Sequence, residues 1–325
     1  MPIPPSLEGG LALPAVAAPM FLTSGPDLVI ETCKNGVIGT FPALNQRTSE
    51  GFEEWLVEIE QALSDFEAAN PGKRAAPYGV NLIVHHTNPR LQADLEICVK
   101  HKVPLIITSL GAVADLVDAV HGYGGVVFHD VTTVRHGRKA AGAGVDGLIL
   151  VCAGAGGHAG IASPFALVPE IRQFFDGTIL LAGCISDGRG IAAAEMMGAD
   201  MAYLGTRFIN TKESMVKDAN RQMIIDAAAA DIVYTPAISG IPANFLRESL
   251  VKAGLDPDNL PAKKEINMGE ELDTESRAWK DIWSAGQGVG SIDDVPSAAD
   301  LCQKLTREYR DAIAGLAGKL ATAAE

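Results

Sequence analysis

One histidine of the chain lies in a run of glycines, where an imidazole can reach a ligand. His158 is the seventh residue of Cys-Ala-Gly-Ala-Gly-Gly-His-Ala-Gly, residues 152–160. Glycine lets the backbone come close to a bound molecule and leaves the imidazole open. Because the pKa of histidine lies near neutrality, His158 could accept a proton from a substrate. The alternative is a surface histidine in a turn, but the position directly after a predicted strand favours catalysis.

Two further glycine-containing segments are candidates for a phosphate site. Residues 182–190 read Ala-Gly-Cys-Ile-Ser-Asp-Gly-Arg-Gly, and residues 204–208 read Leu-Gly-Thr-Arg-Phe. Each follows an apolar run, so that Gly183 and Gly205 would lie where backbone N–H groups and a helix N-terminus can bind a phosphate. Either glycine alone could simply serve a tight turn. Together, after the last two predicted strands, they predict a phosphorylated ligand.

Other polar residues of the predicted strands are weaker candidates. Asn81 lies inside an apolar strand, where its amide needs partners that a ligand could supply. His129 and Asp130 end another strand, and a polar pair of the core is an equally weighted alternative. Cys184 has no base predictably near it, so a packed thiol is favoured over a nucleophile. The five cysteines are scattered without a Cys-x-x-Cys spacing, so neither disulfides nor a metal site are expected.

Short apolar runs alternate with amphipathic segments and must position these residues. Runs of strand length that are apolar throughout are typical of parallel strands buried on both faces. Eight of them occupy residues 15–20, 36–41, 78–84, 104–110, 125–131, 147–153, 178–183 and 201–206. Helices are predicted between them, at residues 26–35, 50–69, 88–101, 112–121, 134–143, 164–175 and 190–198.

This alternation predicts an α/β protein with a (β/α)8 TIM barrel. A doubly wound open sheet is the alternative. It would normally carry a Gly-x-Gly-x-x-Gly turn after its first strand, and Ala18-Pro19-Met20-Phe21 is not one.

The pattern changes after the eighth predicted strand. Residues 212–230 suggest a helix, whereas residues 232–264 carry several prolines and little periodicity. We expect an insertion over residues 213–276 that forms a partial lid on the barrel mouth. Residues 1–212 and 277–325 then make up the barrel, which a helix over residues 298–321 closes.

Composition excludes several classes of function. The formal net charge of −14 disfavours nucleic-acid binding. Met1–Gly10 has no basic region and is not expected to be a signal peptide, and no apolar run reaches membrane-spanning length. We expect a cytoplasmic enzyme with no membrane partner, either a monomer or a homodimer.

Several of these motifs, in this order, resemble the nitronate monooxygenase family, also called the 2-nitropropane dioxygenase-like family. The resemblance rests on Ala18-Pro19-Met20, on Gly79-Val80-Asn81 and on the Gly-Gly-His-Ala-Gly segment around His158. It extends through Asp187-Gly188-Arg189-Gly190, Gly205-Thr206-Arg207-Phe208 and Trp283-Ser284-Ala285-Gly286-Gln287. The matching residues cover most of the chain, from about Pro14 to the C-terminal helix.

The resemblance implies a TIM barrel that binds FMN non-covalently, with its phosphate on the loops after strands seven and eight. It implies oxidation of small alkyl nitronates by O2 to a carbonyl compound and nitrite. His158 matches the family's active-site histidine, which is the base for neutral nitroalkanes, and His158 and Ser284 are the expected donors to an anionic substrate. The expected cofactor-binding residues are Pro19, Met20, Phe21, Asn81, Asp130, Gly156, Gly157, Ala182, Gly183, Cys184, Gly205 and Thr206.

Two flavin enzymes of similar pattern are alternatives: an FMN-dependent enoyl-acyl-carrier-protein reductase and an NADH:quinone reductase. Both need a site for reduced nicotinamide, and the sequence holds no recognisable motif for one. A phosphate-binding isomerase or aldolase without redox chemistry is a third alternative. An aldolase would need a Schiff-base lysine at a strand end, and none of the eight predicted strands ends in lysine.

Overall fold

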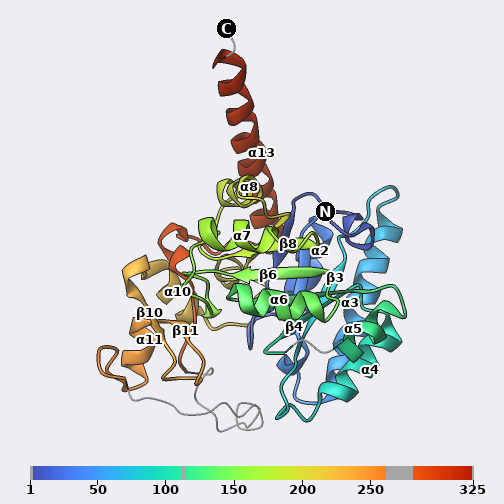
Figure 1. The fold of residues 1–325 in the computed structure, drawn as a ribbon, viewed down its shortest axis with the longest axis horizontal. Helices are drawn as coiled ribbons and strands as arrows, with labels where there is room; N and C mark the ends of the chain where they lie inside the picture. The colour runs from blue at the N-terminus through green and yellow to red at the C-terminus, as the bar shows by residue number, and fades with distance from the viewer. Residues whose placement is uncertain (1–2, 112–113, 261–280, 324–325) are drawn as a thin grey trace.

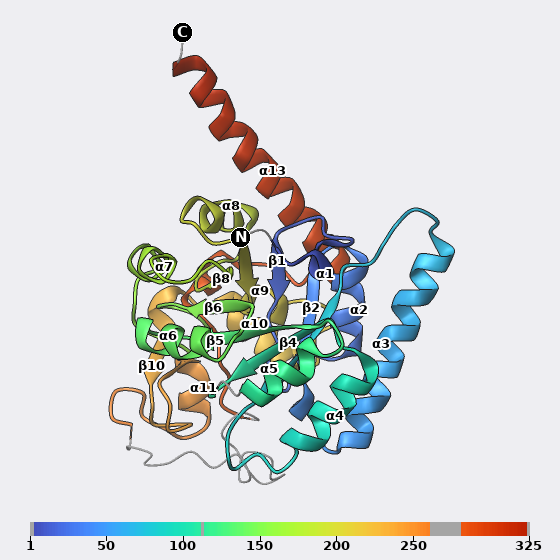
Figure 2. The same ribbon diagram turned by 45° about the vertical axis from the view of Figure 1, so that its right-hand side comes forward.

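Eight parallel strands close into a barrel in the computed structural model, which describes residues 3–111, 114–260 and 281–323 (Figures 1 and 2). Their order around the barrel is β1-β2-β3-β4-β5-β6-β8-β9, and β1 pairs with β9 to complete it. The strands are β1 (Ala15–Ala17), β2 (Ile38–Pro42), β3 (Tyr78–Ile83), β4 (Leu105–Ser109), β5 (Val126–Val131), β6 (Gly147–Val151), β8 (Thr178–Ala182) and β9 (Met201–Leu204). The predicted TIM barrel is confirmed.

Helices surround the barrel, and several begin where the sequence supplies a cap. Thr48, Thr133 and Asp187 each accept a backbone N–H of the helix that follows. The helices between strands are α2 (Pro26–Lys34), α3 (Ser49–Ala69), α4 (Leu91–His101), α5 (Ala114–His121), α6 (Val134–Gly142), α7 (Pro164–Arg172) and α8 (Gly188–Met196). A short α1 (Pro5–Glu8) and the 3₁₀ helix η1 (Ala43–Asn45) complete this part of the chain. The predicted helix over residues 112–121 begins outside the described residues.

Buried apolar side chains pack against both the inner and the outer face of the barrel wall. Strand residues that point inward, such as Phe128, Ile149 and Leu180, form one cluster, and Leu7 of α1 belongs to it. The outward-pointing residues of the strands form a second cluster with the inner faces of the helices. This layering explains why the strands are apolar at almost every position.

The region after β9 is more regular than its sequence suggests. Instead of one helix over residues 212–230, it contains α9 (Thr206–Ile209), α10 (Asp218–Asp226) and the 3₁₀ helix η2 (Ala229–Asp231). Residues 232–264, which show little periodicity in sequence, contain β10 (Ile232–Thr235) and β11 (Ala243–Leu246), which pair in antiparallel fashion. Then α11 (Arg247–Lys252) follows.

A second, three-stranded sheet joins this region to the barrel. Its order is β10-β11-β7, where β7 (Gly157–His158) is part of the glycine-rich loop after β6. The expected partial lid over residues 213–276 extends into residues 261–276, outside the described residues, and its role stays a prediction.

The chain ends on a long helix that stands out from the body. After the 3₁₀ helix η3 (Gln287–Ser291), α13 (Ala298–Ala323) packs against α8 and α2 and then projects away from the barrel (Figures 1 and 2). In the described part of the chain, no helix combines the length and the apolar character that crossing a membrane requires.

Candidate active site

Every site residue expected from the sequence lines one large cavity at the carboxyl ends of the barrel strands. The cavity has a volume of about 1290 Å³. It receives side chains or backbone from the rims of β1, β3, β5, β6, β8 and β9, and from residues 283–286. The expected residues brought together are Pro19, Met20, Phe21, Asn81, Asp130, Gly156, Gly157, His158, Ala182, Gly183, Cys184, Gly205, Thr206 and Ser284.

His158 is half-buried rather than exposed, which corrects the expectation of an open imidazole. It lies on β7, where it pairs with Ala243 of β11. Its Nε2 lies 3.0 Å from Ser239 Oγ, and that hydroxyl donates its proton to the carbonyl oxygen of Ile241 at 3.0 Å. A hydroxyl that donates its proton to Ile241 accepts from His158, which favours the tautomer with the proton on Nε2. Burial lowers the pKa of His158 to about 4, which keeps the ring neutral at pH 7.

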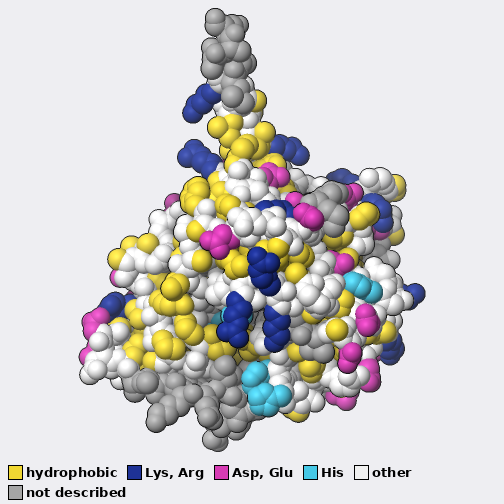
Figure 3. All heavy atoms as spheres, in the orientation of Figure 1, with side chains coloured by type: hydrophobic (Ala, Val, Ile, Leu, Met, Phe, Trp, Pro, Cys, Tyr) yellow, Lys and Arg dark blue, Asp and Glu magenta, His cyan; other side chains and the backbone are white. Residues whose placement is uncertain are grey.

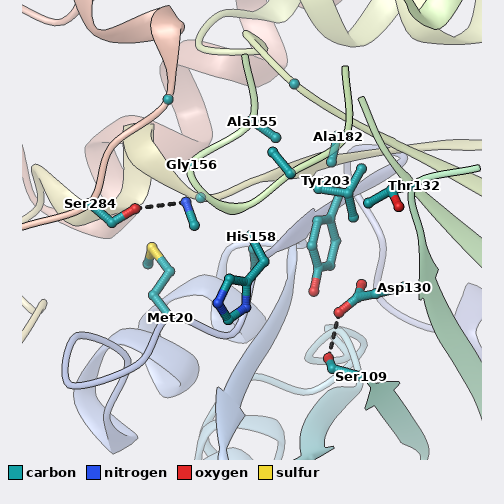
Figure 4. Close-up of a pocket in the computed structure, with 18 of the residues that line it drawn as sticks. Met20, Ser109, Asp130, Thr132, Ala155, Gly156, His158, Ala182, Tyr203 and Ser284 are labelled. Atoms are coloured by element: carbon teal, nitrogen blue, oxygen red, sulfur yellow. Dashed lines mark hydrogen bonds between the residues drawn. The ribbon is translucent and has the colours of Figure 1, made fainter. Parts of the chain in front are cut away.

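Ser284 holds the glycine-rich loop in place. Its hydroxyl accepts the Gly157 N–H at 2.7 Å and donates to the Asn244 carbonyl oxygen at 2.7 Å (Figure 4). The Asn244 side-chain amide in turn donates to the Ala155 carbonyl oxygen at 2.7 Å. Because the single Ser284 proton is used within the protein, this arrangement assigns Ser284 to positioning the loop beside His158.

The loops after β8 and β9 both line the cavity, and the first of them has an unusual backbone conformation. Gly183 has a φ of 128°, and Cys184, a non-glycine residue, has a φ of 58°. Such a conformation costs about 1–3 kcal/mol and tends to occur at functional sites. A Cβ built on Gly205 would come no closer than 3.8 Å to Ala18 Cβ or Met20 Sδ. The cavity beside Gly205 is therefore open enough to admit a ligand.

The neighbouring loops are fixed by hydrogen bonds. Thr206 Oγ1 accepts the Gly286 N–H at 2.8 Å, which ties the loop after β9 to residues 283–286. At the rim of β1, the Met20 carbonyl oxygen accepts from Asn45 Nδ2 at 3.0 Å. Cys184 is exposed and lines the cavity, so it is not the packed thiol favoured by the sequence.

A chain of hydrogen bonds ends at the Asp130 carboxyl, which also lines the cavity. Asn81 Nδ2 donates to Ser109 Oγ at 2.9 Å. Ser109 Oγ in turn donates to Asp130 Oδ2 at 2.5 Å, as Figure 4 shows. The other oxygen, Asp130 Oδ1, is buried without a partner among the described residues. Burial raises the pKa of Asp130 to about 6, although the Ser109 hydrogen bond opposes the shift. The Tyr203 hydroxyl points toward this carboxyl (Figure 4).

This buried carboxyl makes stability depend on pH. In the unfolded chain Asp130 loses its proton near its ordinary pKa of 3.8, but in the folded protein it does so only near pH 6. Asp130 binds more protons in the folded state between these values, so its contribution to stability falls as the pH rises from about 4 to 6 and is lost above 6. Asp130→Asn should therefore raise the free energy of unfolding by about 1–3 kcal/mol at pH 8 and change it little at pH 4.

Urea unfolding of the flavin-free protein at pH 4, 6 and 8 measures this dependence. Asp311→Asn, at an exposed position on α13, is the matched control and should change stability equally at each pH. Destabilisation of Asp130→Asn at pH 8 would show that the carboxylate is a favourable charge in the folded protein.

Sequence reasoning missed several residues of the site. Ser239 and Asn244 lie in the segment that has little periodicity in sequence, and Ser109 and Tyr203 are ordinary strand residues in sequence. For Ser109 a signal was available, since it ends a strand next to the one that carries Asn81. Nothing local to Ser239 indicates that it contacts His158, 81 residues away along the chain.

Comparison with known proteins supports the family that the sequence motifs resemble. Residues 10–308 match a family model described as nitronate monooxygenase. A nitronate monooxygenase of Paraburkholderia phytofirmans is 26% identical over 358 residues, covering 94% of this chain and 94% of the relative. A (3aS,4S,5R,7aS)-5-hydroxy-7a-methyl-1-oxo-octahydro-1H-indene-4-carboxyl-CoA dehydrogenase of Mycobacterium tuberculosis is 28% identical, covering 75% of this chain and 65% of the relative. The chain spans about two thirds of the length of three of its curated relatives, 65–66%.

Solved structures share the same fold. Nitroalkane oxidase from Streptomyces ansochromogenes superposes with a TM-score of 0.79 at 23% identity, covering 96% of this chain and 99% of the other. At this level of identity the likeness establishes the barrel architecture.

Proposed function

The chain belongs to the nitronate monooxygenase family, and on that premise we propose that it oxidises small alkyl nitronates with O2, using bound FMN, to a carbonyl compound and nitrite. The observation that carries the proposal is the setting of His158. An imidazole that is neutral at pH 7 and hydrogen-bonded to Ser239 lies in the same cavity as the loops after β8 and β9. The neutral imidazole of His158 could remove a proton from a nitroalkane. Once the ring had taken up a proton, it could donate a hydrogen bond to a nitronate.

The cavity has backbone N–H groups that could bind the FMN phosphate and enough space for the ring system. Gly183, Cys184, Gly205 and Thr206 would hold the phosphate through the backbone after β8 and β9, where the fold places phosphates. Asn81 and Met20 would contact the ring system. When bound, FMN would supply the redox chemistry with substrate and O2, which no side chain of the site can supply.

The protein's own residues would orient the substrate and control protons. His158 Nδ1 would accept a proton from a neutral nitroalkane, while Ser284 keeps the loop that carries His158 in position. Asp130 would disfavour an anionic substrate when ionised, because both charges would lie in a poorly solvated cavity. Its raised pKa keeps part of it neutral near pH 6.

The test is anaerobic mixing of the purified protein with each candidate reductant, followed by flavin absorbance. We expect a small alkyl nitronate to reduce the flavin quickly and saturably, and NADH and NADPH to reduce it slowly or not at all. The measurement also requires that the protein contain about one FMN per chain, released intact on denaturation. Rapid reduction by NADH or NADPH without a response to nitronate would reject the proposed reaction and leave the family and the fold in place.

A second candidate is a flavin-dependent reductase or dehydrogenase that acts on a larger substrate. The cavity of about 1290 Å³ would have to hold the flavin as well as the substrate, so its volume is compatible with this candidate but does not select it. One relative is named as a dehydrogenase of a carboxyl-CoA compound, which is a larger substrate than a small alkyl nitronate. In the same experiment, rapid reduction of the flavin by NADH or NADPH rather than by nitronate would favour the reductase.

A further inference from the structure

A basic surface lies over α6 in a chain that is otherwise strongly acidic. Between Val131 and Val145 the sequence has three Lys or Arg residues and one His but no Asp or Glu, although the formal net charge of the chain is −14. Lys and Arg side chains gather over α6 on this face of the molecule (Figure 3). Arg135, His136, Arg138 and Lys139 are all exposed. Such a local reversal of sign would attract an anion that the rest of the surface repels.

This basic surface adjoins the cavity of the candidate active site. His136, Lys139 and Ala140 of α6 line the cavity, and so do Ala166 and Leu167 of α7. The cavity therefore continues from the barrel mouth into a groove between α6 and α7. Small and apolar side chains line part of this groove, and cationic side chains stand on its α6 side.

Two large apolar side chains are exposed beside the groove. Ile161, which lines the cavity, is 80% exposed, and Phe165 in the first turn of α7 is 77% exposed. Apolar residues gathered at the mouth of a cavity are typical of binding surfaces. They would cover the uncharged part of a long ligand.

The charges around the groove favour an anion, with one exception. Arg135 and Lys139 are four residues apart, so they lie on the same face of α6. The Arg138 guanidinium lies 4.1 Å from the centre of the Phe174 ring, which holds its charge near the same surface. Glu170 of α7 lines the groove from the other side and opposes an anion there.

We propose that the groove between α6 and α7 binds the phosphate-bearing tail of an extended ligand whose reactive end lies in the barrel mouth. An uncharged linker would lie along Ala140, Ala166 and Leu167, and the phosphates would contact Arg135 and Lys139. Coenzyme A thioesters and pyridine dinucleotides share this chemistry. The inference rests on the proposed function only in placing the reactive end in the same cavity, and it does not depend on nitronate oxidation.

The test is calorimetric titration of the flavin-loaded protein with coenzyme A, pantetheine, NADPH and NADH. We expect coenzyme A or NADPH to bind, and coenzyme A to bind more tightly than pantetheine, which has the same linker without phosphates. Arg135→Ala/Lys139→Ala should weaken the binding of the phosphate-bearing ligand about tenfold or more. Glu170→Gln should strengthen it, because a like charge is removed. Whether coenzyme A or NADPH binds identifies the source of the tail, and NADPH binding would favour the reductase over nitronate oxidation.

Arg307→Ala/Arg310→Ala is the matched control, since both arginines are exposed on α13 and the change in net charge is the same. Equal binding by the groove variant and this control would overturn the inference. So would measurable binding of coenzyme A that pantetheine matches in affinity. If nitronates fail to reduce the flavin while coenzyme A still binds through α6, the inference stands and the proposed reaction fails. If nitronate reduces the flavin and neither coenzyme A nor NADPH binds, the inference fails and the reaction stands.

Discussion

Replacing His158 by asparagine is expected to lower turnover of a neutral nitroalkane by about 10²–10⁴-fold, the usual contribution of a general base. Turnover of the pre-formed nitronate should fall much less, because no proton has to be removed from it. The pKa of about 4 adds a second expectation, that wild-type activity on the nitroalkane does not decline at the ordinary pKa of histidine as the pH falls from 7 to 6. Steady-state rates on nitroethane and its nitronate, per bound flavin, measure both.

Two variants define the role of the imidazole. Ser239→Ala removes the acceptor that holds the His158 Nε2 proton, and it should cause a smaller loss, confined to the neutral substrate. His86→Asn, an exposed histidine outside the cavity, should leave both rates unchanged. Equal, small losses on both substrates in His158→Asn would show that His158 is not the base.

Replacing Gly205 by aspartate is expected to weaken FMN binding by about 10²–10³-fold, because it places a negative charge where we propose the phosphate. The fold should tolerate the change. Gly205 has a φ of −100°, which any residue can adopt, and a new Cβ would meet only ordinary contacts, at 3.8 Å from its nearest neighbours. Titration of the flavin-free protein with FMN, followed by flavin fluorescence, gives the affinity.

Gly205→Asn is the matched variant, since it adds nearly the same bulk without the charge. We expect it to bind FMN more tightly than Gly205→Asp and less tightly than the wild type. Gly315→Asp, with nothing within 4 Å of a new Cβ on α13, controls for the change in net charge. Full flavin occupancy of Gly205→Asp at micromolar protein would mean that the phosphate lies elsewhere.

The sequence by itself determined the barrel and the positions around its rim. Each barrel strand is a local run of apolar residues, as in Gly147–Val151, where every residue is buried. Once eight such runs alternate with helices, their carboxyl ends must meet at one rim. That is why His158, Gly183 and Gly205, each in the segment that follows a barrel strand, could be placed in one cavity from their positions in sequence.

Only the tertiary structure decided how these residues are held and which charge state they adopt. Strand β7 pairs with β11, which lies far along the chain. His158 contacts Ser239, 81 residues away, and Gly157 donates its N–H to Ser284, 127 residues away. Hydrogen bonds between distant segments leave no periodic pattern in either segment, so Ser239 gave no signal.

The electrostatic properties of the site have the same origin. The pKa values of His158 and Asp130 depend mainly on burial, which neighbouring elements impose after the chain has folded. The sequence therefore identified the titratable groups, and the packing of the second sheet and of β4 and β5 around them decided that His158 is neutral and that Asp130 binds its proton until about pH 6.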